Sequence, residues 1–130
     1  MPSLDTNCLL RWLLDDEPEQ TKLITEIINL NESFAVADAA MIETIFVLEK
    51  VKKIGRESIG KAIMAVLGKN NILSNKELFI EILPVYSSYP KLSIVDCYLE
   101  ALARKTGTTP LLTFDEKLGK QLSGAKLLAP

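Results

Sequence analysis

The chain has 130 residues, of which 48% are hydrophobic and 25% charged, and its formal net charge is −2. This length and hydrophobic content predict one compact domain, residues 1–130, with a sizeable core. The longest uninterrupted apolar run, residues 62–67, is too short to cross a bilayer, so we expect a cytoplasmic protein without a membrane partner. The net negative charge argues against a broad basic surface for nucleic acid, so any such binding must be local.

The chain contains no histidine and two cysteines, Cys8 and Cys97. The absence of histidine excludes Ser/His and Cys/His catalysis and histidine-bearing metal sites. Both cysteines lie in apolar helical contexts without metal-ligand spacing, so we expect buried thiols rather than a disulfide or a zinc site. Carboxylates therefore remain the main candidates for acid–base or metal chemistry.

Hydrophobic periodicity in the first half of the chain predicts short strands between longer helices. We expect strands at residues 1–5 and 33–37, and helices at residues 6–14, 18–30, 39–54 and 57–68. The inner side of the second helix is expected to carry Leu23, Ile24, Ile27 and Ile28. Asp38 is a favourable N-cap for the third helix, and Gly55 marks the end of that helix.

The second half of the chain continues the same alternation. Residues 70–77 are expected to form a turn-rich connection, followed by helices at 77–89 and 93–106 and strands at 109–114 and 125–130. Pro90 interrupts the first of these helical patterns, and Gly107 ends the second. Alternating helices and short apolar strands predict an α/β fold with a largely parallel sheet covered on both faces.

Two acids follow predicted strands. Asp5 comes directly after the first strand, and Asp115 comes directly after the strand at 109–114. Ligands of parallel sheets gather at the carboxyl ends of the strands, so we expect both acids at the same rim of the sheet.

Two further acids lie inside predicted helices. Glu43 shares a helix face with small and apolar residues that include Ala39 and Phe46, so its side chain is expected to be at least partly buried. Asp96 likewise lies on a mostly apolar stripe. A carboxylate in such a place needs a partner.

Each acid also has a structural explanation of its own. Asp5 and Asp115 can each cap a helix, Glu43 can pair with Lys50, and Asp96 can lie near its helix start. One divalent cation explains all four together, because hard cations take oxygen ligands and offset the repulsion among carboxylates. That repulsion is roughly 4 kcal/mol for two charges about 4 Å apart at an effective dielectric constant near 20.

Four segments together resemble the PIN-domain nucleases, and in size and layout the VapC-like toxins of toxin–antitoxin pairs. These segments are "LDTN", "AAMIETIFVLEK", "LSIVDCYLEALARKTG" and "LLTFDEKL", which each contain one of the four acids. The resemblance covers essentially the whole chain. It implies a PIN-like three-layer α/β domain with a short, largely parallel central sheet flanked by helices.

The resemblance also implies the roles of particular residues. The acidic centre would consist of Asp5, Glu43, Asp96 and Asp115. Asp5 and Asp96 would bind Mg²⁺ or Mn²⁺ directly, whereas Glu43 and Asp115 would do so directly or through water. Supporting positions would be Thr6, Asn7 and Thr113. Glu100, one helical turn after Asp96, is a fifth acid that faces either this centre or solvent.

The implied activity is metal-dependent endonucleolytic cleavage of RNA, by the toxin of a toxin–antitoxin pair that forms a homodimer and binds a cognate antitoxin. Candidate RNA contacts are Arg11, Lys91, Arg104 and Lys117, although cations near helix ends also serve solubility and the helix dipole. Two alternatives remain open, a free-standing RNA-processing nuclease and a noncatalytic PIN-like binding module. A receiver-type phosphoacceptor domain is disfavoured, because Asp5 stands alone after the first strand.

Overall fold

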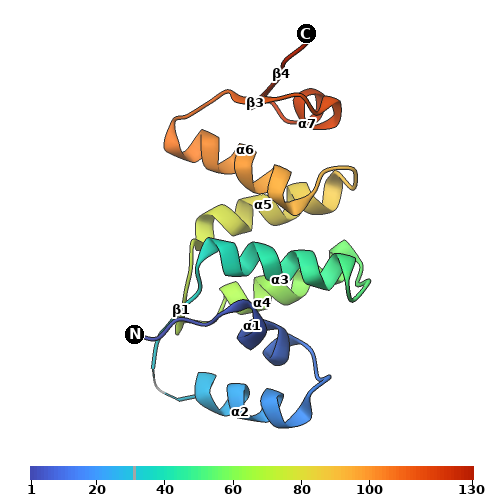
Figure 1. Cartoon of the computed structure of the whole chain (residues 1–130). Helices are drawn as coiled ribbons and strands as arrows, with labels where there is room; N and C mark the ends of the chain where they lie inside the picture. The colour runs from blue at the N-terminus through green and yellow to red at the C-terminus, as the bar shows by residue number, and fades with distance from the viewer. Residues whose placement is uncertain (31) are drawn as a thin grey trace. The chain divides into compact units, whose positions relative to one another are not determined.

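The computed structural model describes residues 1–30 and 32–130. The chain divides into two compact units, Met1–Lys76 and Glu77–Pro130. Each unit consists of helices and a two-stranded parallel sheet (Figure 1). This mixture of helices and short parallel sheets confirms the predicted α/β class. No helix in the described part of the chain is long and apolar enough to span a bilayer.

The first unit contains a small parallel sheet and its helices. Its elements are α1 (Thr6–Leu13), α2 (Pro18–Ile28), β1 (Phe34–Ala35), α3 (Asp38–Lys50), α4 (Arg56–Leu67) and β2 (Ile72–Leu73). β1 pairs with β2 in parallel, with Phe34 opposite Ile72, and Ser3 forms a parallel bridge to Ala35. The chain therefore enters α1 directly after this bridge, which places Asp5 at a strand end as the sequence predicts.

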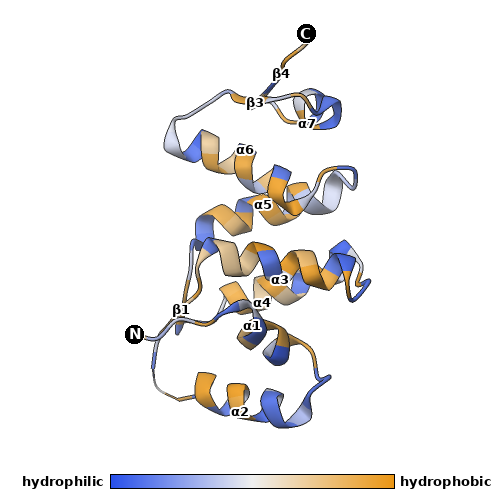
Figure 2. Ribbon diagram, viewed as in Figure 1, coloured by the Kyte–Doolittle hydropathy of each residue, from blue (hydrophilic) through white to orange (hydrophobic). Residues whose placement is uncertain are grey.

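The core of the first unit is mostly aliphatic. α1 packs against α2 and α3, and α3 packs against α4. Side chains that are 2% exposed or less include Leu9, Ile28, Phe34, Met41, Ile45, Ile59, Ile63 and Ile72. α2 changes from hydrophilic in its first turns to hydrophobic in its last turns (Figure 2), and its buried residues are Ile24 and Ile28. Burial of these apolar side chains stabilises the unit by about 1.5–3 kcal/mol for each fully buried side chain.

The second unit contains α5 (Lys76–Ser88, which begins in the last residue of the first unit), α6 (Ile94–Thr106), β3 (Leu111–Thr113), α7 (Glu116–Gln121) and β4 (Ala125–Leu127). β3 pairs in parallel with β4, with Leu111 opposite Ala125. α7 lies against β4, and a Cβ atom at Gly119 would lie only 2.7 Å from the Cβ of Leu127. The glycine is therefore what permits α7 to approach the strand so closely.

Several local expectations are wrong. Residues 72–73 form β2 inside the predicted turn-rich connection, because Ile72 is fully buried and pairs with β1. Ala37, not Asp38, holds the N-cap position of α3, and Asp38 is the first helical residue, accepting a hydrogen bond from Asn75 Nδ2 at 3.4 Å. Leu23 is 59% exposed, because the buried face of α2 is the narrow stripe of Ile24 and Ile28.

Candidate functional site

Asp5 lies where the first extended segment meets α1. Its backbone is extended, and its Oδ1 accepts a hydrogen bond from the backbone N–H of Cys8 at 2.8 Å. This hydrogen bond is the main reason why the pKa of the exposed Asp5 carboxyl is lowered from its ordinary value of 3.8. An ionised carboxylate offers about four acceptor sites, so the helix cap leaves capacity for a metal ion or a water molecule.

Glu43 shares a shallow, open depression with Asp5. The depression has a volume of about 360 Å³, and its lining includes both acids together with Thr6, Ala39 and Ala40. Glu43 is exposed, so the expectation of partial burial is wrong: the neighbouring alanines are too small to cover it. The alternative of a Glu43–Lys50 pair is absent among the described residues, where Lys50 lies instead 3.7 Å from Glu49.

Asp96 is half-buried in the first turn of α6, where it forms a capping box. Its Oδ2 accepts a hydrogen bond from the backbone N–H of Ser93 at 3.0 Å, and Ser93 Oγ accepts one from the backbone N–H of Asp96 at 3.0 Å. The backbone of Ser93 is therefore a partner of this carboxylate on its mostly apolar helix face.

Asp115 is exposed and caps α7. Its Oδ1 accepts a hydrogen bond from the backbone N–H of Leu118 at 3.0 Å, and its own backbone N–H donates to Thr113 Oγ1 at 3.0 Å. Thr113 thus fixes the turn between β3 and the carboxylate. This contact gives a physical basis for the supporting role that the family resemblance implies for Thr113.

The two units supply two acids each. Asp5 and Glu43 belong to Met1–Lys76, and Asp96 and Asp115 belong to Glu77–Pro130. Within residues 1–30 and 32–130, no group of three or more His, Cys, Asp or Glu side chains is arranged to hold a metal ion. The structure therefore brings Asp5 and Glu43 to one depression, while the complete four-acid centre stays a prediction.

The family model of the PIN domain matches residues 3–121. The chain belongs to the PIN domain family. The match runs through both units and includes all four acids, so membership of the PIN-domain nucleases is confirmed. PIN domains are generally nucleases and typically depend on divalent metal ions. No curated protein matches the chain.

The donor chemistry of this PIN domain fits a divalent cation. Asp5 and Glu43 are exposed acids that line the same open depression, and oxygen is the ligand that Mg²⁺ and Mn²⁺ prefer. The pKa of Asp5 lies below an ordinary value of 3.8 that already leaves the carboxyl ionised at neutral pH, so this ligand is charged. The neighbouring thiol is not a competing anion there, because the pKa of Cys8 is raised from its ordinary value of 9.0, first by burial and then by the interaction of the thiol itself with the Asp5 side chain.

The four predicted RNA-contacting cations of the PIN domain differ in their surroundings. Arg11 lies 2.6 Å from Asp16, and Arg104 binds both Glu100 and Glu81. Lys91 and Lys117 are exposed, and no ion pair of either is found in the described part of the chain. The two lysines are therefore more available to phosphate groups than the two arginines.

Glu100 does not face solvent, because it is buried. It is 3% exposed and accepts hydrogen bonds from Arg104 and from the backbone N–H of Gly124. The spacing of Glu100 and Arg104, four residues apart on one helix, is a signal that sequence reasoning missed. The contact with Gly124 has no such local signal.

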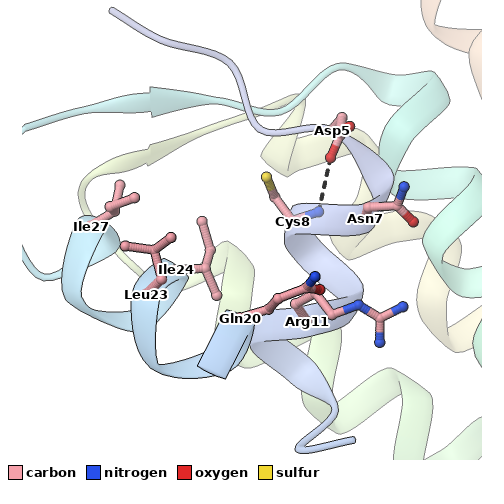
Figure 3. Close-up of a pocket in the computed structure, with 8 residues that line it drawn as sticks. All are labelled: Asp5, Asn7, Cys8, Arg11, Gln20, Leu23, Ile24 and Ile27. Carbon is pink, nitrogen blue, oxygen red and sulfur yellow. Dashed lines mark hydrogen bonds between the residues drawn. The ribbon is translucent and has the colours of Figure 1, made fainter. Parts of the chain in front are cut away.

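A second cavity lies beside Asp5, between α1 and α2. It has a volume of about 290 Å³ and is lined by Asp5, Asn7, Cys8, Arg11, Gln20, Leu23, Ile24 and Ile27 (Figure 3). The side chains that α2 contributes at Leu23, Ile24 and Ile27 make one wall apolar, and Cys8 stands opposite them on α1. Cys8 is half-buried here and Cys97 is buried, and both are free thiols.

Proposed function

We propose that this PIN domain is a metal-dependent endoribonuclease in which residues 1–130 act as a single domain. The observation that carries the proposal is the shared depression of Asp5 and Glu43, two acids from distant parts of the sequence. Glu43 has no ion pair among the described residues that would account for it structurally. Asp96 and Asp115, which the family match also includes, complete the proposed acidic centre.

The chemistry that a bound Mg²⁺ or Mn²⁺ ion would supply is a lowered pKa of a water molecule and neutralisation of charge on the scissile phosphate. In this proposal Asp5 and Asp96 would hold the ion directly, and Glu43 and Asp115 would do so directly or through water. Thr113 supports Asp115 by accepting the hydrogen bond of its backbone N–H, and Thr6 and Asn7 support Asp5 from the first turn of α1. With no histidine in the chain, these carboxylates provide the oxygen ligands and the local negative charge.

RNA binding is proposed to depend on a few local cations. Lys91 and Lys117 are exposed without ion pairs in the described part of the chain, so they contact phosphates first. Arg11 and Arg104 are paired with acids, so they contact RNA only where a phosphate group replaces the acidic partner. Because the net charge is −2, such contacts replace a continuous basic surface.

We further propose that the chain is the toxin of a VapC-like toxin–antitoxin pair, acting in the cytoplasm as a homodimer. PIN nucleases often pair with antitoxins. The apolar cavity between α1 and α2 adjoins Asp5, so an antitoxin segment seated there would also reach the acidic centre with a basic side chain. The competing functions are a free-standing RNA-processing nuclease and a noncatalytic PIN-like module.

Cleavage of labelled single-stranded RNA by the purified full chain tests the proposed activity. We expect cleavage with Mg²⁺ or Mn²⁺ and none in EDTA. Asp5→Asn and Asp96→Asn should each lower the cleavage rate at least about 100-fold. Loss of a residue that only supports a metal ligand costs up to about 100-fold, and loss of a direct ligand should cost at least as much. Asp15→Asn, which makes the same charge change in an exposed loop, should cleave like the wild type.

The same assay separates the alternatives. Full activity of both site variants would overturn the proposed mechanism. An inactive wild-type chain that still binds RNA would favour the noncatalytic module. Equal cleavage of single-stranded DNA would overturn the assignment of RNA as the substrate.

A further inference from the structure

Glu100 is a buried charge in the helix that carries Asp96. It is 3% exposed on α6, one helical turn after Asp96. Burial of a carboxylate is unfavourable unless hydrogen-bond donors surround it. Glu100 meets this requirement with Arg104 Nε at 2.9 Å, Arg104 Nη2 at 3.0 Å and the backbone N–H of Gly124 at 3.0 Å.

Gly124 connects this carboxylate to the strand that leads to Asp115. Its N–H donates to Glu100 Oε2, and its carbonyl oxygen accepts a hydrogen bond of 2.8 Å from the N–H of Leu111, the first residue of β3. β3 ends at Thr113, whose hydroxyl accepts from the backbone N–H of Asp115. Three hydrogen bonds and the backbone of β3 between Leu111 and Thr113 therefore link α6 to the turn of Asp115.

A glycine is required at position 124 for this contact. A Cβ atom there would lie 2.5 Å from Glu100 Oε2 and 3.1 Å from Arg104 Cγ. The buried carboxylate therefore approaches the backbone more closely than any side chain at position 124 would allow.

Arg104 fixes the orientation of Glu100. Its guanidinium donates to both oxygens of Glu100 in a two-pronged arrangement, and its Nη1 also binds Glu81 on α5. Such two-pronged pairs restrict the carboxylate plane more strongly than a single hydrogen bond. Glu100 is thus held from one side by Arg104 and holds Gly124 on the other.

We propose that Glu100 is a positioning residue, which fixes Asp115 relative to Asp96 through Gly124 and β3 and so sets the metal affinity of the acidic centre. The inference rests on the proposed function, because it takes Asp96 and Asp115 as parts of one metal site. Glu100 itself does not bind the ion in this proposal, since it is 3% exposed and three of its about four acceptor sites are already taken by hydrogen bonds.

Two readouts on the full chain test this proposal. The first is the Kd for Mn²⁺, measured by electron paramagnetic resonance, and the second is hydrogen exchange of the Leu111 amide. Glu100→Ala should raise the Kd about tenfold, within the range that loss of an outer-sphere partner causes, and should speed exchange at Leu111. Glu100→Gln should restore part of both, because its amide oxygen still accepts from Gly124.

Three further variants separate positioning from general destabilisation. Glu81→Gln removes the other partner of Arg104 and should leave the Kd within about twofold, as expected for a site away from the metal ligands. Ile82→Val lowers stability from the core of α5 and should also leave the Kd unchanged. Gly124→Ala should reproduce the effect of Glu100→Ala, and the two together should not add.

The outcomes are distinguishable. A wild-type Kd in Glu100→Ala, or a raised Kd in Ile82→Val of the same size, overturns the positioning role while RNA cleavage by the wild type still supports the nuclease. Mn²⁺ binding with the expected variant effects but without RNA cleavage supports the positioning role and overturns the nuclease. A wild-type chain that binds no Mn²⁺ overturns both.

Discussion

Three of the four acids accept a backbone N–H group at the start of a helix. Asp5 caps α1, Asp96 belongs to the capping box of α6, and Asp115 caps α7. Such caps contribute about 0.5–2 kcal/mol each. Capping and metal binding are compatible in one carboxylate, because the cap occupies one oxygen and the ionised form is favoured by both roles. Substitution of these acids therefore changes stability as well as activity.

The cap at Asp5 predicts a pH-dependent contribution to stability. Asp5→Ala should lower the free energy of unfolding by about 1 kcal/mol at pH 7, because the N–H of Cys8 loses its acceptor. The pKa of Asp5 is lowered on folding, chiefly by that hydrogen bond, so its contribution is present above the ordinary value of 3.8 and is lost as the pH falls through the lowered value. Urea unfolding at both ends of this range measures the effect.

Asp5→Asn is the matched control for this prediction. Asparagine caps helices about as well as aspartate, so the variant should stay within a few tenths of a kcal/mol of the wild type and lose the pH dependence. An Asp5→Ala variant that is as stable as the wild type at neutral pH would contradict the capping role.

At the scale of elements, glycines at the ends of helices give a second prediction. Gly107 follows α6 with φ of +68°, a conformation that L side chains rarely adopt, although its surroundings are open. Gly107→Ala should therefore lower the free energy of unfolding by about 1 kcal/mol through backbone strain alone. Thermal unfolding of the two proteins measures the difference.

Gly68 offers the matched comparison, because it follows α4 with φ of −76° and ψ of −9°. A Cβ atom there would meet backbone oxygens at an ordinary distance of 3.4 Å or more. Gly68→Ala should therefore be neutral or stabilise the protein by about 0.4–1 kcal/mol through the unfolded chain. Equal destabilisation by both substitutions would show that backbone conformation at Gly107 is not the cause.

Elements with a strong local pattern are predictable from this sequence, and elements that depend on distant partners are not. The helix that ends at Gly107 combines apolar periodicity with a stop signal, and its bounds agree closely with α6. β2 has only two residues between polar neighbours, and its strand character comes from pairing with β1. The predicted burial of Leu23 is wrong because hydrophobic periodicity identifies the buried face of a helix but not the width of that face.

The site shows the same division between local and distant information. The resemblance to PIN nucleases selects Asp5 and Glu43, and the structure brings both to one depression. The capping box of Asp96 is readable from Ser93 three residues earlier. The contact of Glu100 with Gly124 could not be predicted from the sequence, because the two residues lie far apart in the chain. Only the structure shows that they approach each other closely.

At the scale of the whole molecule, the proposed assembly depends on exposed apolar surface. Leu23 is 59% exposed and lines the cavity beside Asp5, together with the half-buried Ile27. Apolar side chains in such a cavity are favourable contacts for an antitoxin segment, since each buried CH₂ group contributes about 0.8 kcal/mol. A segment bound there would lie next to Asp5, so binding and inhibition of cleavage are expected to occur together.

The last prediction concerns this cavity and the proposed antitoxin, for which the candidate is the product of the gene next to the one that encodes this chain. That product should inhibit RNA cleavage by the wild-type chain, and Leu23→Asp should weaken inhibition at least tenfold, because a charge in an apolar contact must lose its hydration. Leu30→Asp is the matched control: Leu30 is 58% exposed but does not line the cavity, so inhibition should be unchanged.

Both variants should keep wild-type cleavage and the proposed homodimer in light scattering. Equal inhibition of the two variants would overturn this docking surface, and a neighbouring product that neither binds nor inhibits would favour a free-standing processing nuclease.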